Sequence, residues 1–237
     1  MDVDVGARVK GIDWAGVGAG LDELGLAPVG EVLGSDGCRD LVGLYGQDER
    51  FRSTIDMARY RYGEGQYRYF DHPLPDVVRD LRAAFWPHLL DIARTWAERR
   101  GQEAPWPDEF DEWLDRCHAA GQRRPTPLIL RYGPGDWNAL HQDLYGDLVF
   151  PLQVVIGLNR PGQDYTGGEF VVVEQRPRAQ SRATASTIER GHGIVFTTRD
   201  RPVRSARGWA KAPLRHGASV VRSGHRHTLG LVFHDAR

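Results

Sequence analysis

The sequence predicts an α+β protein in which a mainly helical first half packs against an antiparallel jelly-roll core. Before residue 125, apolar residues recur mostly at threes and fours, which is the spacing of helices. After it they form short β-branched and aromatic runs separated by turn clusters, a texture typical of an antiparallel sandwich or barrel. We therefore expect a helical region over residues 1–125 and the β core over residues 126–237.

An apolar stripe over residues 77–96 predicts a long helix that ends at Gly101. Pro87 lies inside this stripe and lacks the amide that an interior position donates, so we expect a kink or the start of a second helix there. A shorter helix is expected over residues 108–120.

Alternation over residues 51–70, with a central Gly-Glu-Gly, predicts two strands or a strand with a loop inside the helical half. Six later runs predict the strands of the core, namely PLILRY, LVFPLQVVIGLN, GGEFVVVEQ, GIVFTT, ASVVRS and TLGLVFH. The segment GVGAG at residues 16–20 superficially suggests a nucleotide loop. No strand precedes it, so we interpret it as a turn.

Charge is balanced over the chain but not along it. The chain has 31 Lys and Arg against 32 Asp and Glu, so its net charge of −1 gives no whole-protein argument for binding nucleic acid. Residues 174–237 hold 13 basic and 4 acidic residues, a net of +9, against 18 and 28, a net of −10, in residues 1–173. Such a basic patch suits a dicarboxylate, a phosphate or a nucleic-acid backbone. A solvated arginine-rich face is the alternative interpretation.

The two cysteines, Cys38 and Cys117, are too few for a disulfide framework and form no Cys-x-x-Cys pair that could hold zinc. Free thiols in a reducing compartment are the simplest interpretation. The first residues do not read as a leader, and no stretch approaches the roughly 18 apolar residues of a membrane helix. We therefore expect a cytoplasmic protein without a membrane partner.

The segment ALHQDLYGD places His141 and Asp143 two positions apart, just before a strand-forming run. Side chains at i and i+2 of an extended backbone point to the same side, so both can reach one ion. An imidazole and a carboxylate are two thirds of the 2-His-1-carboxylate triad that binds non-haem Fe(II). The third ligand must come from a distant strand, and His216 is the preferred candidate.

Arg226 supports the choice of His216, because it follows that histidine by ten residues. Its planar guanidinium is the cation that a terminal carboxylate requires. For His192 we expect a turn role, and for His234 a structural one. His225 and His227 flank the arginine and should point to the opposite face of a strand.

The order His141-Gln142-Asp143, His216, Arg226 resembles the Fe(II)/2-oxoglutarate dioxygenase superfamily over roughly residues 126–235. YGPGDWNALHQD resembles the AlkB-like pattern, in which a Tyr nine residues before the metal His helps to hold the cosubstrate; here that residue is Tyr132. TGGEFVVVE resembles the Gly-Gly-Glu turn of many of these enzymes, in which we interpret Glu169 as a turn or surface carboxylate.

This resemblance implies a double-stranded β-helix core of the AlkB-like and prolyl-hydroxylase-like kind. It also implies Fe(II) on His141, Asp143 and His216, the cosubstrate 2-oxoglutarate on Arg226 and Tyr132, and O2 as the oxidant. Asp143 implies that the enzyme is no halogenase, because halogenating relatives carry a small residue there.

Almost the whole chain is similar to an uncharacterised bacterial family of 2-oxoglutarate and Fe(II) oxygenases suggested to act oxidatively on damaged DNA. The segments RFRSTIDMARYRYGEGQYRYF and RHGASVVRSGHRHTLGLVFHDA carry this similarity. It implies hydroxylation or oxidative demethylation, with alkylated nucleobases in single-stranded DNA as candidate substrates. The basic segments EQRPRAQSR and RPVRSAR agree with a nucleic-acid partner.

Two other hypotheses stay open at this point. The same chemistry could act on a small metabolite, an amino acid or a protein side chain, which near-neutral charge and the lack of an obvious aromatic stacking platform favour. A non-catalytic β-helix binding module is the other, because a fold never guarantees activity. In each case we expect the N-terminal helices and loops such as residues 176–190 to form the pocket walls.

Overall fold

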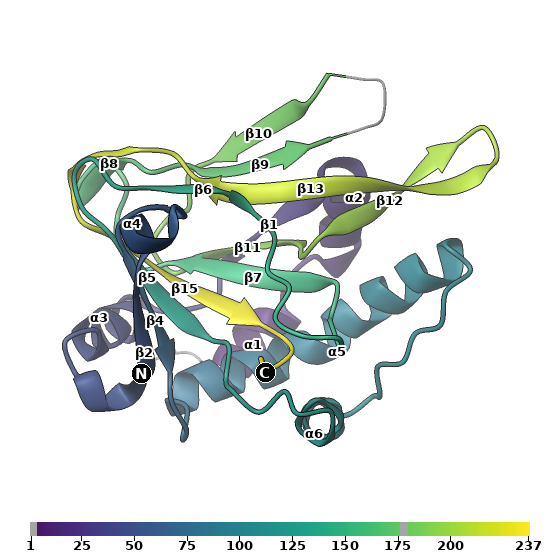
Figure 1. The fold of residues 1–237 in the computed structure, drawn as a ribbon, viewed down its shortest axis with the longest axis horizontal. Helices are drawn as coiled ribbons and strands as arrows, with labels where there is room; N and C mark the ends of the chain where they lie inside the picture. The colour runs from purple at the N-terminus through teal and green to yellow at the C-terminus, as the bar shows by residue number, and fades with distance from the viewer. Residues whose placement is uncertain (1–3, 176–179) are drawn as a thin grey trace.

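The computed structural model describes residues 4–175 and 180–237. Two antiparallel sheets face each other, and helices cover the outer face of the larger one (Figure 1). From edge to edge, the larger sheet consists of β1 (Leu26–Glu31), β11 (His192–Thr197), β7 (Leu152–Gly157), β15 (Arg226–Val232), β5 (Leu128–Tyr132), β4 (Gln66–Phe70) and β2 (Phe51–Asp56). This arrangement confirms the predicted α+β fold.

The smaller sheet lies above the larger one in Figure 1, and no labelled helix lies over its outer face. It consists of β10 (Arg182–Ser186), β9 (Phe170–Glu174), β13 (Gly208–Ala218), β6 (Trp137–His141) and β3 (Gly63–Glu64), with β12 (Asp200–Ser205) paired to β13. The β12–β13 ribbon projects beyond the rest of the molecule (Figure 1). A separate pair joins β14 (Val221–Gly224) to β8 (Tyr165–Gly167).

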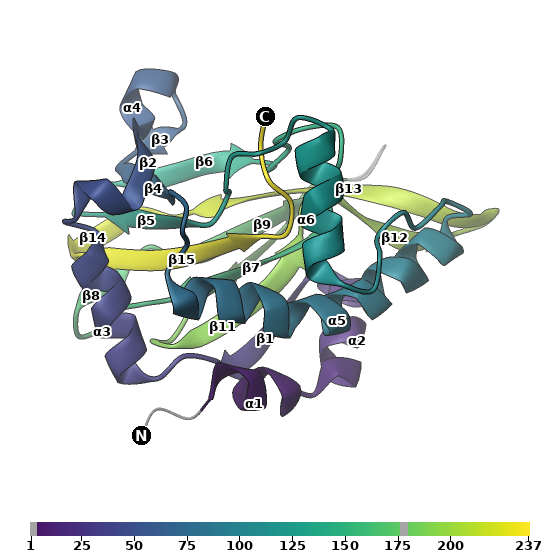
Figure 2. The same ribbon diagram turned by 90° about the horizontal axis from the view of Figure 1, so that it is seen from below.

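The helices and one 3₁₀ turn all come from the first half of the chain. They are α1 (Val5–Lys10), α2 (Trp14–Leu24), α3 (Ser35–Leu44), η1 (Asp48–Arg50), α4 (Met57–Tyr60), α5 (Asp76–Arg99) and α6 (Phe110–Ala119). Figure 2 shows α1, α3, α5 and α6 in front of the larger sheet. The main core lies between that sheet and these helices. Within the described residues, no helix is both long and apolar enough to cross a bilayer.

Two local features of the helices differ from what the sequence suggested. No second helix starts at Pro87, because α5 continues through it, with buried aromatic and aliphatic residues on both sides of the proline packed in the core. The GVGAG segment is not a turn but the middle of α2. Asp13 caps this helix by accepting from the Gly16 amide, Gly25 ends it in the left-handed conformation, and Leu21 is buried.

The strands were predicted incompletely. The two strands expected over residues 51–70 are present as β2 and β4, and they extend the core sheet beside β5. The run ASVVRS is not one strand, because β13 ends at Ala218 and β14 begins at Val221. The sequence did not predict β1, β6, β8, β10 or β12, nor most of β13.

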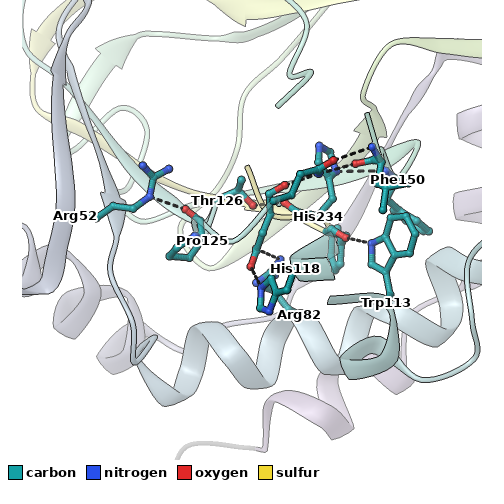
Figure 3. Close-up of polar contacts among 12 residues, drawn as sticks. Arg52, Arg82, Trp113, His118, Pro125, Thr126, Phe150 and His234 are labelled. Carbon is teal, nitrogen blue, oxygen red and sulfur yellow. Dashed lines mark hydrogen bonds and ion pairs between the residues drawn. The ribbon is translucent and has the colours of Figure 1, made fainter. Parts of the chain in front are cut away.

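Buried polar contacts fix the residues just after β15 to helix α5 and to the segments before β5 and β7 (Figure 3). Arg82 of α5 pairs with Asp235 at 3.2 Å, and the Thr126 hydroxyl donates to the His234 carbonyl oxygen at 2.6 Å. The Phe150 amide donates to His234 Nδ1 at 3.3 Å. Because Nδ1 accepts, we infer that the neutral ring carries its proton on Nε2.

The burial of His234 among these contacts should make the fold sensitive to acid. Burial, with a further contribution from Arg82, lowers the pKa of His234 from 6.5 to about 4. Between these values the unfolded chain binds a proton that the folded chain does not, so the free energy of unfolding falls as pH falls, by about 3 kcal/mol in all. In His234→Asn, whose amide oxygen can accept the Phe150 bond, urea unfolding at pH 7, 5 and 4 should show a shallower pH slope. An unchanged slope would contradict this origin of acid sensitivity.

Candidate metal and cosubstrate site

Two neighbouring strands of the smaller sheet position the residues of the candidate triad. His141 ends β6, and His216 lies directly opposite it on β13. Asp143 follows two residues after His141, so its carboxylate reaches the side on which the imidazole lies. Gln142 between them points away, and its amide donates to two backbone carbonyl oxygens at 2.9 and 2.8 Å. The structure thus brings together the three residues that the sequence singled out.

The distances among the three side chains fit a divalent ion. His216 Nε2 is 3.1 Å from Asp143 Oδ2, and His141 Nε2 is 3.5 Å from Asp143 Oδ1. All three ligand atoms lie within 4.8 Å of one another. Atoms that bind an ion at about 2.1 Å, about 90° apart, would be about 3 Å from each other. The spacing is therefore that of a facial triad, which leaves the other coordination positions open.

The protonation states of His216 and Asp143 also suit metal binding. Burial lowers the pKa of His216, and the nearby His141 lowers it further, so its imidazole is neutral. Burial alone would raise the pKa of Asp143, but the two histidines outweigh it and hold that pKa well below its usual range. For His141, burial is outweighed by Asp143 and by the Ala139 carbonyl oxygen, so the pKa is raised. Its Nδ1 lies 2.7 Å from that oxygen, which leaves Nε2 for the ion.

A tyrosine that sequence reasoning missed holds the carboxylate. The Tyr145 hydroxyl donates to Asp143 Oδ1 at 2.7 Å and accepts from the Tyr69 hydroxyl at 3.1 Å. Burial, with Asp143 adding to it, raises the pKa of Tyr145 well above its usual value, so the hydroxyl remains a donor. Its position two residues after Asp143 was the available signal, because the same i, i+2 spacing identified His141.

Arg226 and Tyr132 lie opposite each other on β15 and β5. The guanidinium carbon is 5.4 Å from the Tyr132 ring centroid, the arginine is 3% exposed, and its Nε has no hydrogen-bond partner. An orphaned buried donor in a cavity fits an incoming carboxylate. Gly168 makes room for it, because a Cβ there would lie 2.8 Å from Arg226 Cδ. Glu169 of the same turn bonds to the Ser219 hydroxyl and stays outside the triad.

The remaining candidate histidines lie elsewhere in the described parts of the chain. His192 begins β11, after a turn in which its amide bonds back to Glu189 at 3.0 Å. His225 lines a second, polar hollow, and His227 contacts Asn159 through Nδ1 at 2.9 Å. None of these rings joins the triad.

A cavity of about 390 Å³ between the two sheets contains the triad, Arg226 and Tyr132. Its aromatic lining consists of Tyr62, Tyr67, Tyr69, Tyr132, Tyr145, Phe170 and Phe196. The N-terminal part of the wall comes from the β2–β4 region and not from the N-terminal helices, so that expectation is wrong. Residues 180–190 do not line the cavity either, and residues 176–179 lie outside the described residues.

Comparison with known proteins agrees with this chemistry. Residues 65–236 match the family model Oxygenase-NA, described as "Oxygenase, catalysing oxidative methylation of damaged DNA". The chain is 64% identical over 167 residues to the uncharacterized proteins Rv2227 and MT2286 of two Mycobacterium tuberculosis strains. The matched region covers 70% of this chain and 72% of each relative.

The fold is similar to solved structures of 2-oxoglutarate and Fe(II) oxygenases. A Pseudomonas putida prolyl-4-hydroxylase matches with a TM-score of 0.57 and 17% identity, covering 94% of this chain and 99% of that one. An oxidoreductase of the 2OG-Fe(II) oxygenase family from Burkholderia pseudomallei matches with a TM-score of 0.50 and 18% identity, covering 94% and 91%. At these identities the likeness establishes the fold.

Proposed function

Because the chain belongs to the Oxygenase-NA family and is a 2-oxoglutarate- and Fe(II)-dependent oxygenase, we propose that it removes alkyl groups oxidatively from nucleobases in single-stranded DNA. The observation that carries this proposal is an aromatic cavity opening directly onto the triad. Inserting an oxygen atom into a C–H bond cannot add a methyl group. We therefore propose that a methyl or larger alkyl carbon already on the base is oxidised.

The chain's own residues would bind and orient the reactants. His141, Asp143 and His216 would hold Fe(II), while Arg226, assisted by Tyr132, would pair with the far carboxylate of 2-oxoglutarate. When bound, Fe(II) and 2-oxoglutarate supply the activation of O2, with one oxygen atom entering the substrate C–H bond, the other entering succinate, and CO2 leaving. The resulting N-hydroxymethyl group would lose formaldehyde and return the base with its proton. The buried rings of Tyr132, Phe170 and Phe196 would limit the access of water to this site.

The cavity wall suits a flat base with polar edges. Tyr67 and Tyr69 meet edge to face at 5.4 Å, and Tyr69 and Tyr145 do so at 6.1 Å, so rings line the path to the triad. Gln153 lines the same cavity, is 3% exposed, and has no partner for its Nε2. A ring nitrogen or carbonyl oxygen of a base would satisfy this donor. A flipped or unpaired base is read in this way, by stacking and by edge hydrogen bonds.

The electrostatics of the C-terminal region favour a polyanion. Residues 201–234 contain seven basic and no acidic residues. Five of the seven are exposed, on the β12–β13 ribbon and on β14, namely Arg204, Arg207, Lys211, Arg215 and Arg222. Arg176 and Arg178 of the segment EQRPRAQSR lie outside the described residues. Binding to a DNA backbone should therefore weaken steeply with salt.

A panel of single-stranded oligonucleotides tests the substrate class. Enzyme loaded with Fe(II) and 2-oxoglutarate is incubated with oligonucleotides carrying N-methylated, N-ethylated or O-methylated bases, and with unmodified controls. We expect succinate above the uncoupled background, with an equal amount of formaldehyde from one or more N-methylated substrates. If only amino-acid, peptide or metabolite pools raise succinate above background, the nucleobase proposal is wrong and the oxygenase assignment stands.

A further inference from the structure

Some of the exposed apolar side chains lie at the cavity, because Tyr62 and Leu140 are in its lining. The large ones among the described residues are Tyr60, Tyr62, Trp137, Leu140, Leu144 and Val220. The first two come from α4 and the residues just after it, and the next two from β6, which pairs with β3 directly after Tyr62. Tyr62, Leu140 and Tyr60, which stacks on Tyr62, therefore form an exposed apolar rim at the cavity, and an exposed apolar patch marks a contact surface.

Tyr60 and Tyr62 form a stack that leads out of the cavity. Their ring centroids are 5.6 Å apart, with 19° between the ring planes. Tyr62 lines the cavity, whereas Tyr60 lies outside the lining, so the stack begins at the mouth and extends into solvent. Tyr60 is 55% exposed and Tyr62 is 49% exposed, which leaves ring surface free for a further aromatic group.

The backbone holds this stack in place. Met57, which begins α4, is fully buried in a cluster with Tyr132. The Ala139 amide donates to the Tyr62 carbonyl oxygen at 2.7 Å, which ties the stack to β6. Arg61 adopts φ 59°, a left-handed conformation that non-glycine residues rarely take. The rings are therefore presented by a fixed turn close to the cosubstrate end of the site.

The same turn supplies positive charge. Arg61 is exposed, lines the cavity mouth and makes no ion pair within residues 4–175 and 180–237. Arg59, two residues earlier, lies 3.6 Å from the Asp56 carboxylate. An unpaired guanidinium beside free ring surface matches a nucleotide, which has a flat base and an adjacent phosphate.

We propose that Tyr60 and Tyr62 form a stacking platform for the base next to the target nucleotide, while Arg61 contacts the phosphate between the two. This inference rests on the proposed function, and it describes how single-stranded DNA would enter the site. Every base has a π face, so the platform would accept any neighbouring base and would contribute affinity without sequence preference. The target base would then lie in the cavity beyond Tyr62.

Binding to unmodified single-stranded oligonucleotides tests the platform without turnover. Fluorescence anisotropy at low salt compares the wild type with Tyr60→Ala, Tyr62→Ala and Arg61→Asn; asparagine is chosen because it tolerates the left-handed conformation. Each tyrosine variant should bind about 5- to 150-fold more weakly, the range that loss of one base–aromatic stack produces. Tyr60→Phe and Tyr62→Phe should bind like the wild type. An oligonucleotide with 2-aminopurine beside the target should be quenched by the wild type and not by the alanine variants.

The outcomes separate the two proposals. If the wild type binds and the alanine variants bind equally well, the platform is wrong and the proposed function stands. If the wild type does not bind single-stranded DNA at low salt, both fail. Weakened binding by the phenylalanine variants would also overturn stacking, because it would show that the hydroxyls act instead. Unfolding midpoints of all variants show whether a loss of binding is a loss of fold.

Discussion

Asp143→Asn is expected to abolish tight binding of Fe(II), and with it the turnover of 2-oxoglutarate. The substitution keeps the size of the side chain but removes the charge that lies 3.1 Å from His216 Nε2 and 3.5 Å from His141 Nε2. Tyr145→Phe should have a smaller effect, because it removes only the hydroxyl that orients the carboxylate. Outer partners of this kind typically contribute about 10- to 100-fold in metal affinity. The loss in Asp143→Asn should exceed that range.

Anaerobic calorimetry measures the Fe(II) affinity of both variants. The visible band that forms when 2-oxoglutarate chelates the bound metal reports whether the cosubstrate binds. Asp147→Asn is a matched control, because Asp147 lies four residues further on, is exposed, and pairs only with Arg237 among the described residues. Its metal affinity should equal that of the wild type. If Asp143→Asn also bound Fe(II) as tightly as the wild type, the triad would be an ordinary polar cluster, and the non-catalytic binding module would be the better interpretation.

The sequence located the triad but not the strand that completes it. His141 and Asp143 could be paired because an i, i+2 relation is local, and His216 was chosen through its spacing to Arg226. The strand β13 that carries His216 reads GWAKAPLRHGA, with no β-branched residue, so its own composition does not favour a strand. Pairing with β6 and β9 makes it one, and such long-range pairing leaves no periodic signal.

The sequence analysis also did not predict the exposed stack of Tyr60 and Tyr62, for a related reason. Tyr60 and Tyr62 alternate as strand residues would, and Tyr67 and Tyr69 do the same, but alternation does not say which face a ring occupies. The chain turns through a short helix and the left-handed Arg61 between these two pairs. As a result, one pair stacks at the cavity mouth and the other lines its wall. The lack of an obvious stacking platform in the sequence is therefore no argument against aromatic rings at the cavity mouth.

Arg226→Gln is expected to weaken binding of 2-oxoglutarate by about 2 to 5 kcal/mol, or about 30-fold to several thousand-fold in Kd. Arg226 is 3% exposed, and its Nε has no partner in the described protein, so the carboxylate of the cosubstrate would be its principal counter-charge in the cavity. The affinity of Arg226→Lys for 2-oxoglutarate should lie between that of the wild type and that of Arg226→Gln, because lysine keeps the charge and loses the planar pair of donors.

The specificity of this loss is the stronger test. 2-Oxopentanoate has the same keto-acid end and chain length as 2-oxoglutarate but a methyl group in place of the far carboxylate. The wild type should strongly prefer 2-oxoglutarate, whereas Arg226→Gln should bind the two acids about equally, because the interaction that distinguishes them is gone. Calorimetry on the Fe(II)-loaded proteins measures all four affinities. If the substitution weakens the binding of both acids by the same factor, Arg226 acts by supporting Tyr132 and the cavity wall. The far carboxylate of 2-oxoglutarate must then be bound elsewhere.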